Sequence, residues 1–186
     1  MVTLGTLWLP ILLSALACWI LNAVFWTASP HHKSDWLPLP DDGGILPAMR
    51  AAGLRQGMYY FPREKGPESA RDPEARALLE RGPSGYMIVE PRGVASMGKA
   101  MLLAFVLNLA VASGAAYAAS VGLAQGASYL DVFRLIATVV LLAYATERFS
   151  ISIWFGHSWA STWKSTFDAV ILALVSGGIF GWLWPQ

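Results

Sequence analysis

The sequence carries little charge, which excludes an ordinary soluble domain. Only 13% of its 186 residues are Asp, Glu, Lys or Arg, whereas a soluble domain usually carries about a quarter. Hydrophobic residues make up 55%, and the mean hydropathy is +0.48. Apolar surface on this scale needs lipid to cover it. The formal net charge is +1, and without a basic excess we expect no nucleic-acid partner.

The sequence also lacks the residues that several kinds of site require. Its single cysteine, Cys18, lies in the first apolar run, so the chain can form neither a disulfide framework nor a cysteine-based zinc site. It contains no phosphate-binding glycine loop, dinucleotide-binding glycine pattern, nucleophile elbow or zinc-protease helix motif. We therefore assign no catalytic residue and expect no cofactor.

The few charges that are present are concentrated in one stretch. Residues 1–32 contain none, whereas residues 33–99 hold ten of the 13 basic and nine of the 12 acidic side chains. The distribution predicts an apolar span, a polar insert and an apolar bundle. We expect an all-α membrane protein with about four transmembrane helices and a small α+β cytoplasmic insert, residues 27–98, between the first and second helices.

Four apolar stretches are long enough to cross a bilayer, whose hydrocarbon core needs about 20 helical residues. They cover residues 4–26, 99–120, 130–147 and 165–184, and the third, which is the shortest, can extend toward Phe155. Residues 99–186 thus hold the second to fourth helices, with an interfacial segment expected at 148–164. The first stretch has no basic residues before it and no small-residue cleavage site after it, so we expect a retained helix and not a signal peptide.

The basic residues also predict an orientation. Lys and Arg are abundant in residues 33–99 and present in residues 148–164, but absent from both ends of the chain and from residues 121–129. Loops rich in Lys and Arg stay in the cytoplasm. We therefore expect a multi-pass protein of a bacterial inner membrane, with residues 27–98 inside and both termini outside.

The polar insert shows local signals for a small folded unit. The run Asp72-Pro73-Glu74 predicts a helix start, with Gly82 as the stop. Short strands are expected at residues 58–61 and 86–89, and a short helix is expected at residues 46–52. A unit of two short strands is too small to be stable alone, so we expect it to lie on lipid or on another protein.

Small residues recur in the second and fourth spans, where they favour close helix packing, the main attraction between helices in lipid. The expected packing residues are Ala110, Gly114, Ala118, Gly177, Gly178 and Gly181. Aromatic residues gather near the span ends, as in the interfacial belts of membrane proteins. The expected interfacial residues are Trp26, Trp36, Trp154, His157, Trp159 and Trp163.

Directly after the first span, the chain carries His31, His32 and Asp35. Two imidazoles and a carboxylate are suitable metal ligands, and in a loop adjacent histidines can face one ion. The alternative is an interfacial turn whose histidines meet lipid headgroups. Glu147, Arg148 and Asp168 lie near the cytoplasmic ends of their spans, where a structural ion pair such as Arg148 with Asp168 is compatible with their positions.

Several stretches resemble an uncharacterised family of bacterial four-helix inner-membrane proteins. The matching stretches are HHKSDW (31–36), MYYFP (58–62), RGPSGY (81–86), SMGKA (96–100), GASYLDVFR (126–134), SIWFGHSW (152–159) and FGWLWP (180–185). The resemblance implies four spans but no activity, since no catalytic residues are assigned in that family.

Three functions are consistent with these features. The first is a non-catalytic accessory or scaffold protein, a subunit of a larger membrane complex, whose partners are the lipid bilayer and other membrane subunits or further copies of itself. The second is a small membrane metal-binding protein or enzyme that uses His31, His32 and Asp35. The third is a carrier for a small solute or lipid, which predicts a polar cavity near Asn22 and Asn108.

Overall fold

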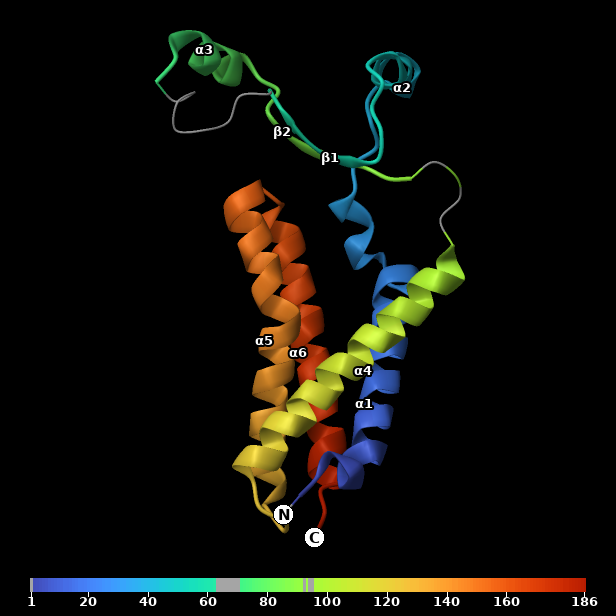
Figure 1. Ribbon diagram of the computed structural model, residues 1–186, viewed down its shortest axis with the longest axis vertical. Coiled ribbons are helices and arrows are strands. Elements are labelled where there is room, and N and C mark those ends of the chain that lie inside the picture. Colours follow the sequence, from blue (N-terminus) through green and yellow to red (C-terminus); the bar gives the residue numbers. More distant parts are fainter. Residues whose placement is uncertain (1, 63–70, 92, 94–95) are drawn as a thin grey trace. The chain divides into compact units, whose positions relative to one another are not determined.

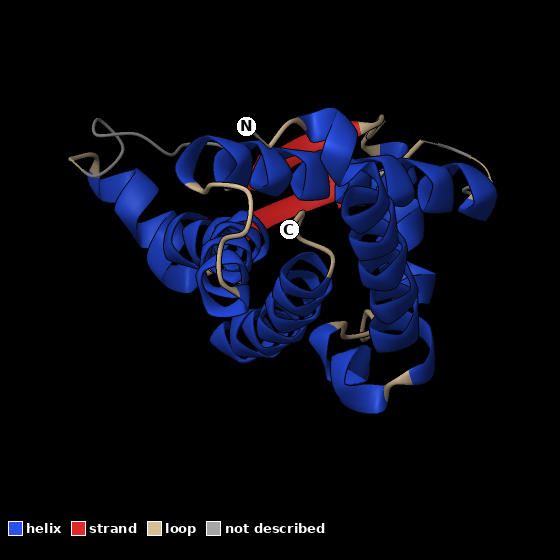
Figure 2. Cartoon of the chain, turned by 90° about the horizontal axis from the view of Figure 1, so that it is seen from below, coloured by secondary structure: helices blue, strands red, loops and turns tan. Residues whose placement is uncertain are grey.

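The structure is a computed structural model that describes residues 2–62, 71–91, 93 and 96–186. The chain divides into two compact units. The first unit, Met1–Trp36 with Ser96–Gln186, holds the long helices, and the second, Leu37–Ala95, holds the polar insert (Figure 1). The view in Figure 2 shows that helices dominate and that the strands form one short pair. The predicted fold class is confirmed.

Four helices of the first unit are long and apolar enough to cross a membrane, so the chain is a multi-pass membrane protein. The first is a continuous helix over Leu4–Ala28, made of α1 (Trp8–Ala23), a 3₁₀ turn before it and a π-helical turn after it. The others are α4 (Met97–Gly122), α5 (Tyr129–Phe155) and α6 (Trp159–Trp182).

The junction between α5 and α6 differs from the expected interfacial segment at 148–164. Helix α5 continues to Phe155, and α6 begins already at Trp159. Gly156 ends α5 in the left-handed conformation, with φ +67°, which glycine adopts without steric cost. Most of residues 148–164 are therefore helical, and only a tight turn joins the two helices.

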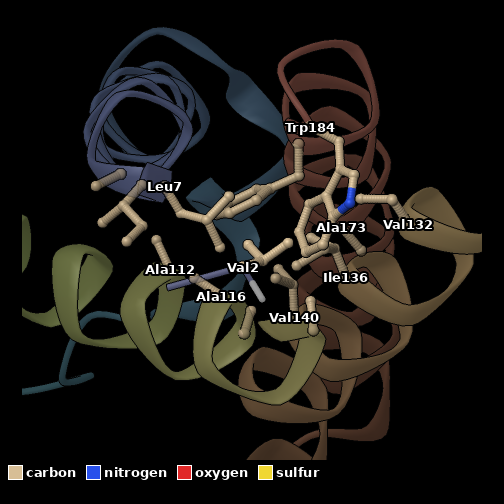
Figure 3. Close-up of a cluster of buried hydrophobic side chains, with 14 residues drawn as sticks. Val2, Leu7, Ala112, Ala116, Val132, Ile136, Val140, Ala173 and Trp184 are labelled. Atoms are coloured by element: carbon tan, nitrogen blue, oxygen red, sulfur yellow. The ribbon is translucent and has the colours of Figure 1, made fainter. Parts of the chain in front are cut away.

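Within the helical unit, α5 and α6 form the most extensive helix pair. Helix α1 packs against α4 and α6, and α4 also contacts α5 while crossing α1 obliquely (Figure 1). Both termini lie at the same end of this unit (Figure 1). At that end, apolar side chains from all four helices form the core, among them Leu7, Ala116, Ile136 and Phe180 (Figure 3).

Two glycines of α6 allow the close approach of α5. A Cβ on Gly177 would lie 2.9 Å from the Phe133 carbonyl oxygen, and one on Gly181 would lie 2.8 Å from the Tyr129 ring. Gly178 has more room, since its Cβ would lie 3.7 Å from the nearest atom. Gly177 and Gly181 therefore occupy positions where any side chain would separate the helices.

The packing face of α4 differs from the predicted one. Ala110 and Gly114 are exposed and Ala118 is half-buried. The buried residues are instead Ala112, Ala115, Ala116 and Ala119. These alanines follow the i, i+3, i+4, i+7 spacing of one helix face. Small residues occur all round this helix, so their spacing alone did not reveal which face packs.

The second unit contains α2 (Asp42–Ala51), β1 (Gly57–Phe61), α3 (Pro73–Arg81) and β2 (Gly85–Val89). The strands pair antiparallel, from Gly57 opposite Val89 to Phe61 opposite Gly85. The Asp72 side chain accepts a hydrogen bond from the Glu74 amide and caps α3. The insert was predicted to cover residues 27–98, but residues 27–36 belong to the helical unit, so the second unit begins only at Leu37. Residues 63–70, 92 and 94–95 of the predicted insert lie outside the described residues.

Helix α2 begins earlier than the sequence suggested. The Asp41 side chain accepts a hydrogen bond from the Gly44 amide at 3.0 Å and caps the helix. Pro47 consequently lies inside the helix and not in its first turn. The two glycines near the start of the helix are poor helix formers, so the sequence pattern did not predict a helix there.

Candidate metal centre

The candidate site is built on a 3₁₀ segment, Pro30–Asp35, that follows the first transmembrane helix. Ser29 has an extended backbone and ends the helix, and Pro30 begins the next turn with its fixed φ. This turn carries His31 and His32 back against α6 of the same unit. The site lies at the end of the helical unit opposite the termini and the apolar core.

Both histidines direct Nε2 at one carboxylate, that of Asp168 on α6. His31 Nε2 lies 3.0 Å from Oδ1 and 3.4 Å from Oδ2, and His32 Nε2 lies 2.7 Å from Oδ2. The Asp168 side chain is only 8% exposed. Two imidazole nitrogens and a carboxylate thus converge on one small volume, with one donor atom from each residue within 4.8 Å of the others.

The second nitrogen of each imidazole is also held by an oxygen. His31 Nδ1 is hydrogen-bonded to Ser29 Oγ at 2.5 Å, and His32 Nδ1 lies 2.6 Å from Asp35 Oδ2. The His32 ring is stacked on Trp26, with parallel planes and centroids 4.1 Å apart. These contacts fix the orientation of both rings before any ligand binds.

Asp35 is anchored in turn by residues of α6. Its carboxylate accepts hydrogen bonds from Lys164 Nζ at 2.7 Å and from Ser161 Oγ at 3.0 Å. Burial on its own would raise the pKa of Asp35, but the hydrogen bonds from His32, Lys164 and Ser161 together with the Lys164 charge lower the pKa to about 2. Asp35 is therefore an ionised acceptor at neutral pH.

This donor set suits a transition metal ion. Imidazole nitrogens with a carboxylate are typical ligands of Zn²⁺ and Fe²⁺, and three protein ligands leave a coordination position open. Histidines that bind a metal usually donate their other ring N–H to a carboxylate, carbonyl or water, which orients the ring. His32 with Asp35 has that arrangement, and Ser29 provides an oxygen for His31.

The predicted ligand set is changed in one member. The sequence placed Asp35 beside His31 and His32, but Asp168 takes that position. The two nitrogens of an imidazole point in different directions, so Asp35, held on His32 Nδ1, lies on the opposite side of the ring from Asp168. The expected pairing of Asp168 with Arg148 is also wrong, since Asp168 binds the two histidines.

The other predicted site residues lie outside this cluster. Trp36, Trp154, Trp159 and Trp163 are exposed, and His157 is half-buried in the turn after α5. Trp26 is exposed over 44% of its surface, yet its ring packs on His32. Sequence reasoning favoured a place in the interfacial belt for Trp26, with a ligand-binding aromatic box as the alternative. Nothing in a linear pattern shows which ring a tryptophan stacks on.

A small cavity of about 60 Å³ adjoins the site between the first helix, α5 and α6. Its walls include Trp26 and Asp168 from the cluster, together with Asn22, Arg148 and Ser165. Tyr144 also lines it and donates a hydrogen bond to Asn108, whose amide donates to the Ala104 carbonyl. Of the two asparagines predicted near a polar cavity, Asn22 is therefore at its wall and Asn108 lies behind Tyr144.

Farther into the bundle, α1 and α6 share a second polar contact. Ser14 donates to Ser176 at 2.9 Å, and Cys18 Sγ lies 3.3 Å from the same serine oxygen. All three residues are buried. They form a hydrogen-bonded helix contact, and Cys18 is too far along the helix to take part in the histidine cluster.

Comparison of the chain with protein-family models, with curated proteins and with solved structures found no match.

Proposed function

We propose that this chain is a membrane protein that binds one divalent transition metal ion, of the Zn²⁺ or Fe²⁺ class, through His31, His32 and Asp168. One observation carries the proposal: both Nε2 atoms face the same carboxylate while both Nδ1 atoms are held by other oxygens. Mg²⁺ and Ca²⁺ prefer an all-oxygen set, so imidazole ligands favour a first-row transition metal.

The competing interpretation is a purely structural clamp between the segment after α1 and α6. Without a metal, each nitrogen of His32 is hydrogen-bonded to a carboxylate. With a metal, the Nε2 lone pair binds the ion and only Nδ1 donates, to Asp35. The two states use the same side chains, and metal binding distinguishes them.

The metal centre lies on the side of the membrane from which the polar insert leaves the first helix. We propose that this side is the cytoplasm of a bacterial cell with the protein in its inner membrane, because Lys and Arg are concentrated between residues 33 and 99. Both termini are then outside. The site would take its metal ion from the cytoplasm.

Metal content tests the proposal directly. The protein would be purified in a mild detergent, and bound metals would be measured by mass spectrometry and by titration with Zn²⁺ and Co²⁺. We expect one ion per chain in the native protein and its loss in His31→Ala, His32→Ala and Asp168→Asn. His157→Ala and Asp131→Asn are matched controls, because they remove the same chemical groups elsewhere. Equal metal binding in all five variants would overturn the proposal.

A second candidate function is an accessory subunit of a larger membrane complex or of a self-associating assembly. The outer face of α4 favours it, because Ala110 and Gly114 are exposed and a Cβ on Gly114 would meet nothing within 4 Å. Such a face allows a neighbouring helix to approach closely. Purification from native membranes with identification of retained partners tests it, and Gly114→Leu should release a partner bound there.

A further inference from the structure

Resting on the proposed metal centre, we propose that the adjoining cavity binds a phosphate group, held by Arg148 and coordinated to the metal ion. The cavity shares Asp168 with the metal site, and Trp26 forms a wall of the cavity while it stacks on His32. A group bound in the cavity therefore meets Asp168, one of the three proposed ligands of the ion. Three protein ligands leave room for it in the coordination sphere.

Besides the metal ion, Arg148 supplies a positive charge that would attract the phosphate group. It is half-buried on α5 and lines the cavity. Among the described residues no hydrogen bond or ion pair holds its guanidinium. The carboxylate nearest to it in the cavity wall, Asp168, is engaged by the two histidines. The guanidinium is thus available for an anion.

The remaining polar walls support the same ligand class. The Asn22 amide and the Ser165 hydroxyl are neutral hydrogen-bond donors on the first helix and on α6. A cavity of about 60 Å³ has room for one oxyanion group. Arginine binds phosphate oxygens in a bidentate geometry, and the phosphate can belong to a lipid headgroup or to free inorganic phosphate.

The charge of Asp168 makes the two ligands depend on each other. A carboxylate in the cavity wall repels an anion, and a divalent ion bound to that carboxylate reverses the local charge. Metal should therefore strengthen phosphate binding, and by thermodynamic linkage phosphate should strengthen metal binding by the same factor.

The test uses the full-length protein in a phosphate-free detergent, with Co²⁺ as the metal probe. The visible spectrum of bound Co²⁺ is followed while inorganic phosphate is added, and in a parallel sample while phosphatidic acid in mixed micelles is added. Arg148→Gln is compared with Arg134→Gln, which removes an exposed arginine from the other end of the same helix. Phosphate binding to the metal-free protein is measured by calorimetry.

We expect Co²⁺ to bind in both variants and phosphate to change its spectrum. Arg148→Gln should weaken the phosphate effect at least about tenfold, as expected for loss of a charge-assisted hydrogen bond, and Arg134→Gln should leave it unchanged. A response to phosphatidic acid alone identifies a lipid headgroup as the source, and a response to both identifies a general phosphate site.

Two results would overturn the inference in distinguishable ways. If Co²⁺ binds but neither phosphate source changes its spectrum, or if the two arginine variants behave alike, the phosphate site is wrong and the metal centre stands. If Co²⁺ does not bind to the native protein, both are wrong.

Discussion

His32 lies between two carboxylates, with Nδ1 2.6 Å from Asp35 and Nε2 2.7 Å from Asp168. One carboxylate comes from the same turn, three residues along, and the other from a helix 136 residues away. The ring is only 3% exposed and stacks on Trp26. This arrangement joins the end of the first helix to α6 and gives each carboxylate a distinct part in the proposed centre.

Replacing Asp35 with Asn should weaken metal binding without abolishing it. The amide keeps the shape of the side chain but loses the charge that orients His32. Loss of such an outer partner typically lowers metal affinity by about 10- to 100-fold. Titration with Co²⁺ measures the change, and Asp131→Asn should leave the affinity unaltered. An affinity equal to that of the native protein would show that Asp35 does not act through His32.

The stability of the metal-free helical unit should fall in acid because of Asp35. The pKa is about 2 in the folded chain against an ordinary value of 3.8, so the ionised carboxylate stabilises the fold above about pH 4, and this contribution is lost as the pH falls toward 2. Asp168, the other carboxylate at His32, is unchanged in Asp35→Asn, so the difference between native and variant isolates Asp35. Unfolding temperatures in detergent with a chelator present measure it. A constant difference from pH 5 to pH 2 would contradict the prediction.

Gly177→Ala should destabilise the α5–α6 pair. The new Cβ would lie 2.9 Å from the Phe133 carbonyl oxygen and 3.2 Å from the Ala137 Cβ, so the helices must move apart. Overpacking of this kind costs about 1–3 kcal/mol. The matched control is Gly114→Ala on α4, where nothing lies within 4 Å and the higher helix propensity of alanine adds up to about 1 kcal/mol. Thermal unfolding should therefore move in opposite directions for the two variants.

The contact between Ser14 and Ser176 should contribute little to stability despite its burial. Their hydroxyl oxygens are 2.9 Å apart, and hydrogen bonds between helices in membranes average about 0.6 kcal/mol in double-mutant cycles. A cycle with Ser14→Ala, Ser176→Ala and the double variant measures the coupling free energy of the pair. A coupling of several kcal/mol would show that this contact, and not apolar packing, holds α1 on α6.

Much of the fold follows from local properties of the sequence. The four apolar helices are long enough to cross a bilayer, and their number and order can be predicted from the hydropathy along the sequence. The start of α3 at Asp72 and its end at Gly82 depend on contacts within a few residues. The helix ends were less accurate, since α6 begins at Trp159 and not near residue 165. Polar residues in the first turns of a helix resemble a loop when hydropathy alone is considered.

The candidate site depends on contacts between parts of the chain that are far apart in the sequence. The sequence by itself determined that a membrane helix is followed by His31, His32 and Asp35, a set of metal-ligating side chains. Only the tertiary structure decided that Asp168 converges with His31 and His32 and that Asp35 holds His32 at Nδ1. That choice depends on which face of α6 turns toward the first helix and on the direction of each imidazole nitrogen. Packing between helices that are distant in the sequence determines the face that α6 turns toward the first helix and the directions of the imidazole nitrogens, and the spacing of residues along the chain does not predict either.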